Sequence, residues 1–221
     1  KSVDIPLIAD IDTGYGNPIN VVRTVNDVID QGIACAILED QEWPKRCGHL
    51  DGKRVISIEE HVEKIRAVRS VSWESGLVIV ARTDTRAELG LTDAIQRGNA
   101  YYEAGADVIF IEAPQTEEEL GEIPSALPDI PLLANMIVGG KAPCLSAQDL
   151  EKLGFKLGVF ALSGLFAATK GIEDCYRFLK ENGTTSGFEK RSLLADYKEI
   201  ISIKKYQELE GKFSIRKPHT E

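Results

Sequence analysis

The sequence of 221 residues has no apolar run that approaches the roughly 18 residues of a membrane span, so we expect no contact with a bilayer. It also lacks a basic excess, and its net charge of −9 argues against nucleic acid as a partner. The acidic balance does not exclude an anionic substrate, because a bound metal ion can reverse the local electrostatic field.

Cysteine is scarce, and the four cysteines form no Cys-x-x-Cys pair, so we expect free thiols in a reducing compartment. Three of them, Cys35, Cys144 and Cys175, are expected to have structural roles. The chain starts at Lys1 without an initiator methionine or a signal-peptide pattern. We therefore expect a cytoplasmic protein, and an organellar location stays open because a targeting segment can be removed upstream.

Short β-branched segments alternate with helical patterns along the chain, which predicts repeated βα units and a parallel sheet. The predicted strands are almost wholly apolar, as is typical of parallel strands that are buried on both faces. They span residues 5–11, 33–39, 77–82, 107–112, 130–135 and 157–162, and the predicted helices span residues 18–31, 59–72, 92–104, 116–126, 147–153, 165–182 and 189–210.

Polar residues gather where the predicted strands end, which is where βα barrels keep their chemistry. These residues are Asp10, Asp12, Glu39, Asp40, Arg82, Asp84, Glu112, Asn135 and Ser163. An open doubly wound sheet is the alternative, but it would carry a phosphate loop after its first strand. Gly14-Tyr15-Gly16-Asn17 lies there without the GxGxxG spacing, so the α/β barrel is favoured.

A (β/α)8 TIM-type barrel has eight strands and the sequence shows six, so we expect the first two βα units to precede Lys1. The predicted domains are a barrel over residues 1–182 (equivalent to strands 3–8), a linker over 183–188 and a C-terminal helical extension over 189–221. The helix of the extension is apolar. It can pack on a neighbouring subunit or fold back on its own barrel, and both alternatives remain open.

Asp10 and Asp12 are two residues apart at the end of the first predicted strand, a spacing that puts both carboxylates on one face. Two carboxylates on one face repel each other unless a cation joins them. Oxygen ligands without a nearby histidine pair favour Mg²⁺, or alternatively Mn²⁺, over Zn²⁺. We predict a metal site formed by Asp10, Asp12 and, directly or through water, Glu39. A solvated turn is the alternative for the aspartate pair alone.

Cys47 lies among Lys45, Arg46 and His49 on a loop that follows a predicted strand. A thiol in these surroundings, on a loop with the backbone freedom of Gly48, suits general acid/base catalysis under a lid. We predict catalytic roles for all four side chains, with the cations holding substrate carboxylates. A nucleophilic cysteine–histidine pair ranks lower, because no third residue is placed to orient it. An exposed basic loop without a function is the remaining alternative.

Two further strand-end residues suit the binding of an acid. Arg82 can hold a carboxylate through two parallel hydrogen bonds, and Asp84 is expected to orient Arg82 or to cap the next helix. Asn135 is a neutral donor for a carboxylate or an oxyanion, or else a strand-end amide with satisfied hydrogen bonds.

Six stretches resemble, in order, the isocitrate lyase/phosphoenolpyruvate mutase superfamily. They are Ala-Asp-Ile-Asp-Thr-Gly-Tyr-Gly-Asn (9–17), Leu-Glu-Asp-Gln (38–41), Pro-Lys-Arg-Cys-Gly-His (44–49), Ala-Arg-Thr-Asp (81–84), Glu-Ala-Gly-Ala-Asp-Val-Ile-Phe (103–110) and Ala-Asn-Met…Gly-Gly-Lys…Pro (134–143). The cysteine loop resembles the carbon–carbon lyases, since the phosphonate mutases lack that cysteine. The stretch after Asn135 is more similar to 2,3-dimethylmalate lyase and the petal death protein than to typical 2-methylisocitrate lyases.

The resemblance implies an Mg²⁺-dependent lyase that cleaves a 2-hydroxy di- or tricarboxylate to a 2-oxo acid and a carboxylic acid. It also implies a homotetramer that exchanges its last helix between subunits. The implied residue roles are metal binding by Asp10, Asp12 and Glu39, proton donation by Cys47, and substrate contacts by Gly48, Arg82, Glu112 and Asn135. The family's first strands, which supply a further acidic residue, are absent from these 221 residues. An oxaloacetate hydrolase or decarboxylase and a non-catalytic barrel remain alternatives.

Overall fold

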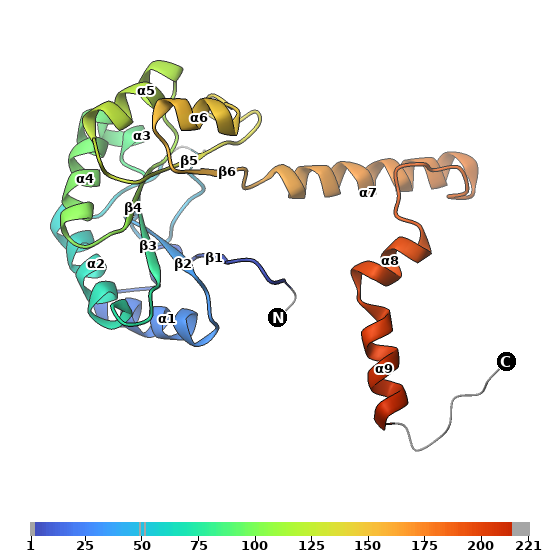
Figure 1. The fold of residues 1–221 in the computed structure, drawn as a ribbon. Helices are drawn as coiled ribbons and strands as arrows, with labels where there is room; N and C mark the ends of the chain where they lie inside the picture. Colours follow the sequence, from blue (N-terminus) through green and yellow to red (C-terminus); the bar gives the residue numbers. More distant parts are fainter. Residues whose placement is uncertain (1–2, 49, 51, 214–221) are drawn as a thin grey trace. The chain divides into compact units, whose positions relative to one another are not determined.

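The first of two compact units in the chain, Lys1–Ser163, is built on one parallel sheet. The computed structural model describes residues 3–48, 50 and 52–213. The six strands lie in the order β1-β2-β3-β4-β5-β6, so each strand pairs with the next one along the chain. They are β1 (Ile8–Asp10), β2 (Cys35–Glu39), β3 (Val78–Thr83), β4 (Val108–Ile111), β5 (Leu132–Asn135) and β6 (Leu157–Val159). The sheet is curled (Figure 1), which confirms the predicted barrel-type α/β fold as an arc of six strands.

Helices connect the strands and lie along the outer side of the curled sheet (Figure 1). They are α1 (Pro18–Asp30), α2 (Ile58–Ser72), α3 (Arg86–Leu89), α4 (Leu91–Glu103), α5 (Glu117–Ala126) and α6 (Ala147–Leu153). Each was expected from the sequence except α3, a single turn that follows β3.

Local sequence signals explain where the helices begin and end. The side chain of Asn17 accepts backbone hydrogen bonds from the first turn of α1, and Oδ1 of Asn20 accepts one from the backbone N–H of Asn17, which forms a capping box. Pro18 occupies the first position of α1, where its missing N–H costs nothing. Ser146 caps α6 in the same way as Asn17, and Gly154 ends α6 with a φ of 112°, a conformation that favours glycine.

The core has two layers on the two faces of the sheet. The larger layer lies between the strands and the helices and includes the fully buried Ile79, Ile109 and Tyr101. The smaller layer lies on the inner face and consists of Cys35, Val80, Val108, Phe110 and Leu133. Cys35 therefore behaves as the small buried hydrophobe that its place in a strand predicts.

The two edge strands differ from the four inner ones. Residues of β2 to β5 are nearly all buried, as the apolar sequence of these strands predicts, whereas β1 and β6 are mostly exposed. Ile8 on β1 and Leu157 on β6 keep 46% and 37% of their surface exposed. The apolar character of the edge strands is thus not accounted for by contacts among the described residues.

The second compact unit, Gly164–Glu221, is helical. It contains most of α7 (Ser163–Asn182), together with α8 (Leu194–Ile200) and α9 (Ile203–Phe213). The predicted single helix over 189–210 is wrong, because Ser202 has a φ of 53° and separates α8 from α9. The predicted grouping of residues 1–182 with the barrel stays a prediction, since α7 falls in the second unit of this chain.

None of the described helices combines the length and the hydrophobicity that crossing a bilayer requires.

Candidate active site

The register of the sheet brings the predicted site residues to one edge. Glu39 pairs with Arg82 across β2 and β3, and Thr83 pairs with Ile111 across β3 and β4. Glu112 and Asn135 follow at the ends of β4 and β5. Because all strands are parallel, these carboxyl ends form a single rim, as the sequence predicts.

Asp10 and Asp12 both lie at this rim, but their backbone positions differ from the prediction that both belong to one strand face. β1 ends at Asp10, and Asp12 lies in the following turn with a φ of 50°, so the two residues do not share a strand face. They remain close, because the backbone N–H of Asp12 donates to Oδ1 of Asp10 at 3.0 Å. The carbonyl of Asp12 accepts from the backbone N–H of Glu39 at 2.8 Å, which ties the turn to β2.

Lys45 places its ammonium group between two of the predicted metal ligands. Its Nζ lies 2.5 Å from Oδ1 of Asp12 and 3.8 Å from Oε1 of Glu39. Burial lowers the pKa of Lys45, but the hydrogen bond to Asp12 and the charge of Glu39 outweigh it and raise the pKa overall. Lys45 is thus the counter-charge of this acidic cluster in the structure.

Glu39 is a buried carboxylate of the rim without hydrogen-bond partners among the described residues. Its side chain is fully buried, and neither oxygen accepts a hydrogen bond. Burial raises its pKa to about 7, although Arg82 opposes the rise. A buried carboxylate without donors is costly unless a cation compensates it.

The chemistry of these side chains fits a hard divalent cation, since Asp10, Asp12 and Glu39 offer only carboxylate oxygens as ligands. The oxygens of Glu39 also accept no hydrogen bond from the part of the chain that the structure describes. Among the described residues, no group of three or more His, Cys, Asp or Glu side chains is arranged to hold a metal ion. The three carboxylates are therefore candidates for ligands, and their metal role remains a prediction.

Arg82 is the centre of a buried charge cluster on the same rim. Asp84 holds it by two hydrogen bonds, at 2.8 Å to Nε and 3.0 Å to Nη2, as the sequence predicted for an orienting residue. Nε also lies 3.6 Å from Glu39, and Nη2 lies 3.3 Å from Glu112. Burial lowers the pKa of Arg82, but Asp84 and Glu112 outweigh it and raise the pKa above its ordinary value.

Asn135 lies beside this cluster. Its Nδ2 donates to Oε2 of Glu112 at 3.4 Å, and its Oδ1 is buried without a donor. Arg82, Glu112 and Asn135 therefore form one continuous set of polar groups, which suits the recognition of a small acid with several oxygens.

The loop between β2 and α2 reaches the rim at Gly48, and we call its described residues (43–48, 50, 52 and 53) the lid loop. Its two stems pair with each other, through an antiparallel bridge between Gln41 and Val55 and a hydrogen bond from the N–H of Ile56 to the carbonyl of Asp40. Gly48 is buried: a Cβ added there would meet Nη2 of Arg82 and Cγ of Glu112, each at 2.5 Å. The lid loop thus rests on the Arg82–Glu112 pair.

The predicted catalytic residues of the lid loop have different positions. Cys47 and Arg46 are exposed, Lys45 is half-buried at the acidic cluster, and His49 lies outside the described residues. The side chain of Gln41 fixes the loop at Arg46, because it donates to the carbonyl and accepts from the N–H of that residue, both at 2.8 Å.

A buried network behind the rim was not predicted. Asp40 accepts hydrogen bonds from the hydroxyl of Tyr101 at 2.8 Å, from Arg97 at 3.2 Å and from the backbone N–H of Asp84 at 3.0 Å. Burial raises the pKa of Asp40, and these donors oppose the rise. The network fixes the ends of β2 and β3 relative to α4. A charged residue in the apolar pattern of α4, Arg97, was the only signal for it in the sequence.

The fold is that of a βα barrel, and its cluster of charges lies at the C-terminal strand ends, where such barrels keep their active sites. A family profile described as phosphoenolpyruvate phosphomutase matches residues 1–179. The chain belongs to the phosphoenolpyruvate mutase/isocitrate lyase superfamily.

Curated relatives carry the names of mutases and lyases. The chain is 44% identical over 215 residues to the chloroplastic carboxyvinyl-carboxyphosphonate phosphorylmutase of Arabidopsis thaliana, covering 96% of this chain and 63% of that protein. It is 39% identical over 215 residues to 2,3-dimethylmalate lyase of Eubacterium barkeri, covering 97% and 74%. It is 39% identical over 211 residues to 2-methylisocitrate lyase of Bacillus subtilis, covering 95% and 69%. The chain thus spans between 63% and 74% of the length of these relatives.

Solved structures share the fold. 2,3-Dimethylmalate lyase matches with a TM-score of 0.88 and 32% identity, covering 95% of this chain and 70% of that one. Oxaloacetate acetylhydrolase bound to 3,3-difluorooxalacetate matches with a TM-score of 0.87 and 34% identity, covering 94% and 70%. Phosphonopyruvate hydrolase in complex with oxalate and Mg²⁺ matches with a TM-score of 0.83 and 28% identity, covering 96% and 74%.

Proposed function

We propose that the protein is an Mg²⁺-dependent carbon–carbon lyase that cleaves a 2-hydroxy di- or tricarboxylate of the 2-methylisocitrate or 2,3-dimethylmalate type. The single observation that supports this best is the lid loop: it carries Cys47 and rests by Gly48 on Arg82 and Glu112. A proton donor on a loop above a buried set of acid-binding groups suits a reaction that releases a carbanion. The lyase names of two relatives agree with it.

In the proposed reaction, Asp10, Asp12 and Glu39 would hold the metal ion, which when bound neutralises the 2-oxygen and one carboxylate of the substrate. A base takes the proton of the 2-hydroxyl group, the C2–C3 bond breaks, and its electron pair stays on C3 of the departing acid. Cys47 then gives its Sγ proton to that carbon. Arg82 and Asn135 hold the carboxylate oxygens on which negative charge develops.

Oxaloacetate hydrolysis is the second candidate, and the 34% identity and TM-score of 0.87 to oxaloacetate acetylhydrolase favour it. The same metal ligands and Arg82 would serve it, with water as the co-substrate. A decarboxylase would use the same groups and would release CO₂ instead. Products separate these reactions, since hydrolysis gives acetate and oxalate, whereas decarboxylation gives pyruvate and CO₂.

The experiment that tests the proposal is an assay of substrate consumption with Mg²⁺, in parallel with and without EDTA, in which the products are identified by chromatography. The panel contains 2-methylisocitrate, 2,3-dimethylmalate, isocitrate, oxaloacetate and phosphonopyruvate. EDTA-sensitive cleavage of one hydroxy acid supports the lyase and names its substrate. Turnover of oxaloacetate alone favours the second candidate, and turnover of phosphonopyruvate alone contradicts both. A folded protein that turns over none of the five favours a non-catalytic barrel or a substrate outside this panel.

We also propose that the protein forms a homotetramer in the cytoplasm or in an organelle, and that residues 189–221 exchange between subunits. Exposed apolar side chains on α8 and α9 support this proposal, among them Leu194, Ile200 and Phe213, at 69%, 70% and 72% exposure. Apolar surface of this extent favours association. Imaging of the tagged natural protein tests the compartment, and the oligomer is tested at the scale of the whole molecule below.

A further inference from the structure

Lys53 is a buried lysine at the far end of the lid loop. Its side chain is 2% exposed, whereas a typical lysine of this chain such as Lys152 keeps 75% of its side chain exposed. Burying an ammonium group is costly unless it has anionic or carbonyl partners. Lys53 has no part in the proposed chemistry, so its burial needs another explanation.

The partners of Lys53 join the lid loop to the rim. Its Nζ donates a hydrogen bond to the carbonyl oxygen of Gly48 and lies 3.7 Å from Oδ1 of Asp84. Asp84 is the carboxylate that holds Arg82 by two hydrogen bonds. One ammonium group therefore contacts both the main chain of the lid and the residue that orients the central arginine.

Gly48 is also a point at which the backbone of the lid loop touches the rim. A side chain at this position would collide with Arg82 and Glu112, so only a bare backbone can approach them so closely. The carbonyl that Lys53 holds belongs to this same residue. The hydrogen bond thus fixes the lid loop at a residue that contacts Arg82 and Glu112, two of the proposed substrate-binding groups.

We propose that Lys53 is a positioning residue that latches the lid loop onto the Arg82–Asp84 pair. Its ammonium group completes the charge balance of Asp84 and holds the Gly48 carbonyl, so that closing the lid and orienting Arg82 become one event. Opening the lid breaks the hydrogen bond to Gly48 and leaves Lys53 with Asp84 alone. The effect of the latch on turnover rests on the proposed lyase function, but the latch itself does not.

The test compares the natural protein with Lys53→Met, which keeps an unbranched side chain, one heavy atom shorter, and removes its charge. Native-state digestion with an arginine-specific protease, followed by mass spectrometry, measures cleavage of the Arg46–Cys47 bond in the lid. We expect Lys53→Met to be cut at least about tenfold faster, because a hydrogen bond from a charged donor shifts an equilibrium by that factor or more. An unchanged cleavage rate in a folded Lys53→Met protein overturns the latch.

Lys152→Met is the matched control, since it makes the same chemical change at an exposed lysine of α6. It is expected to digest at the natural rate. Digestion is run without substrate, so it tests the latch even if the protein is not a lyase. In the turnover arm, Lys53→Met is expected to lower kcat/KM about 10²-fold with most of the loss in kcat, the scale of a misplaced reacting group. Loss of latch protection without loss of turnover overturns the positioning role.

If Lys53→Met does not fold, amine labelling of the natural protein with acetic anhydride replaces the digestion. Lys53 is then expected to react at least about tenfold more slowly than Lys152, and oxalate with Mg²⁺, used as the probe for a closed site, is expected to slow it further. Labelling of Lys53 at the rate of Lys152 overturns the latch. Slow labelling that the probe leaves unchanged supports the latch and contradicts the proposed binding of an acid with Mg²⁺ at this site.

Discussion

At the residue scale, the rim combines buried charged groups, each of which would be costly to bury without the others. Glu39 is buried without a hydrogen-bond donor, and Lys45 brings an ammonium group within 3.8 Å of it. Arg82 lies among three carboxylates, those of Glu39, Asp84 and Glu112. Such arrangements persist where they serve binding or catalysis, which makes single substitutions informative here.

The first prediction concerns the proposed proton donor. Cys47→Ser is expected to lower turnover about 10²-fold or more, the usual scale of acid/base catalysis, because a hydroxyl is a far weaker acid than a thiol. Isothermal titration with Mg²⁺ is expected to be unchanged, since Cys47 is exposed and is none of the predicted metal ligands. Steady-state kinetics measure the first effect. Natural turnover in the serine variant contradicts the assignment.

The second prediction concerns the seat of the lid. Gly48→Ala would place a methyl group 2.5 Å from Arg82 and Glu112, so the lid must lift. We expect kcat/KM to fall about 10²-fold, because the reacting groups are displaced. Gly121→Ala is the control, as its added Cβ would meet only Leu153 at 3.9 Å in helix α5. Equal kinetics for both alanine variants would show that Gly48 has no special role.

The third prediction is a pH dependence from His61. Burial, aided by the charges of Lys64 and Arg97, lowers its pKa from 6.5 to about 3, and its ring packs 4.5 Å from that of Tyr101. The unfolded chain therefore binds a proton below pH 6.5 that the folded chain does not. Stability is present above pH 6.5 and is lost as the pH falls towards 3, by about 1.4 kcal/mol per pH unit from this group.

His61→Leu removes the difference in proton binding at this position between the unfolded and the folded chain. Urea unfolding between about pH 5 and pH 7 is expected to give a shallower fall in the free energy of unfolding for the variant, by about 1.4 kcal/mol per pH unit. Measurements at about pH 8 isolate the effect of the substitution on packing, since His61 is neutral there in both the folded and the unfolded chain. Parallel pH curves for the two proteins would contradict the assignment.

Sequence reasoning found the acidic and basic residues of the rim because parallel strands bring their ends together. It misplaced the geometry of Asp12, since the left-handed turn after β1 has no periodic signal. It also gave no role to Gln41 and Lys53, which bond to main-chain atoms of the lid. Contacts of that kind depend on the path of a loop, which residue type and spacing do not encode.

At the element scale, one arginine ties α2 to the sheet. Arg69 donates to the carbonyl of Gly105 at 2.9 Å and lies 2.6 Å from Oδ2 of Asp107, which in turn accepts the backbone N–H of Ile79 at 2.7 Å. A helix, a turn and the start of β3 are thereby held together. The pair is only partly exposed, so solvent screens it less than a surface pair.

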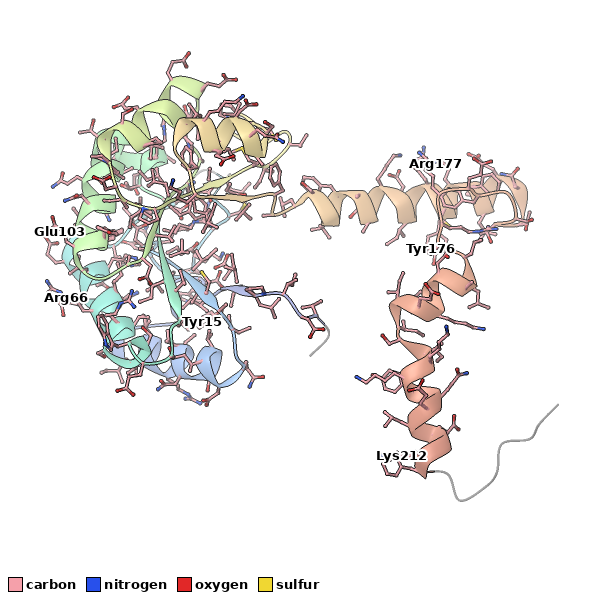
Figure 2. All side chains as sticks on the ribbon, viewed as in Figure 1. Tyr15, Arg66, Glu103, Tyr176, Arg177 and Lys212 are labelled. Atoms are coloured by element: carbon pink, nitrogen blue, oxygen red, sulfur yellow. The ribbon has the colours of Figure 1, made fainter. Side chains whose placement is uncertain are left out.

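The fourth prediction follows from this tie. Arg69→Leu is expected to lower the free energy of unfolding by about 1–3 kcal/mol, because it removes the side-chain donor of the Gly105 carbonyl and the cationic partner of Asp107. Arg66→Leu is the matched control on the same helix: the side chain of Arg66 points away from the sheet (Figure 2) and, within the described part of the chain, pairs with the exposed Glu63. We expect a change within about 0.5 kcal/mol for the control. Urea unfolding measures both.

The predicted elements agree with the structure wherever hydrophobic pattern and capping residues coincide, as in α1 and α6. They were too long at the edge strands, where β1 and β6 contain only three paired residues each. The prediction of a single helix over 189–210 was wrong for a different reason. Its apolar pattern is continuous, and nothing in the local sequence marks the left-handed conformation at Ser202.

At the scale of the whole molecule, the second unit is marked by unburied apolar surface. Tyr176 and Arg177 extend from α7, and Lys212 lies near the end of α9 (Figure 2). All described helices of this unit lack a buried residue. The predicted exchange between subunits would cover these faces, and the alternative, folding back on the same chain, would also cover them.

The fifth prediction separates these alternatives. If α8 packs on a partner subunit, Ile200→Glu is expected to raise the dissociation constant tenfold or more, since burying an isoleucine is worth about 1.5–3 kcal/mol. Lys198→Glu on the same helix is the control and is expected to leave the oligomer intact. Sedimentation velocity over a range of concentrations measures both. An unchanged oligomer with a lower unfolding temperature would favour folding back on the same chain.

The strand order of the sheet has a consequence for how the protein reaches its structure. Because each strand pairs with the next one in the chain, every pairing closes a loop no longer than one βα unit. Short loop closures cost little entropy and favour rapid formation of the contacts they join. The arc can therefore assemble progressively from any pair of neighbouring units, and each strand pairing requires only the two units that it joins.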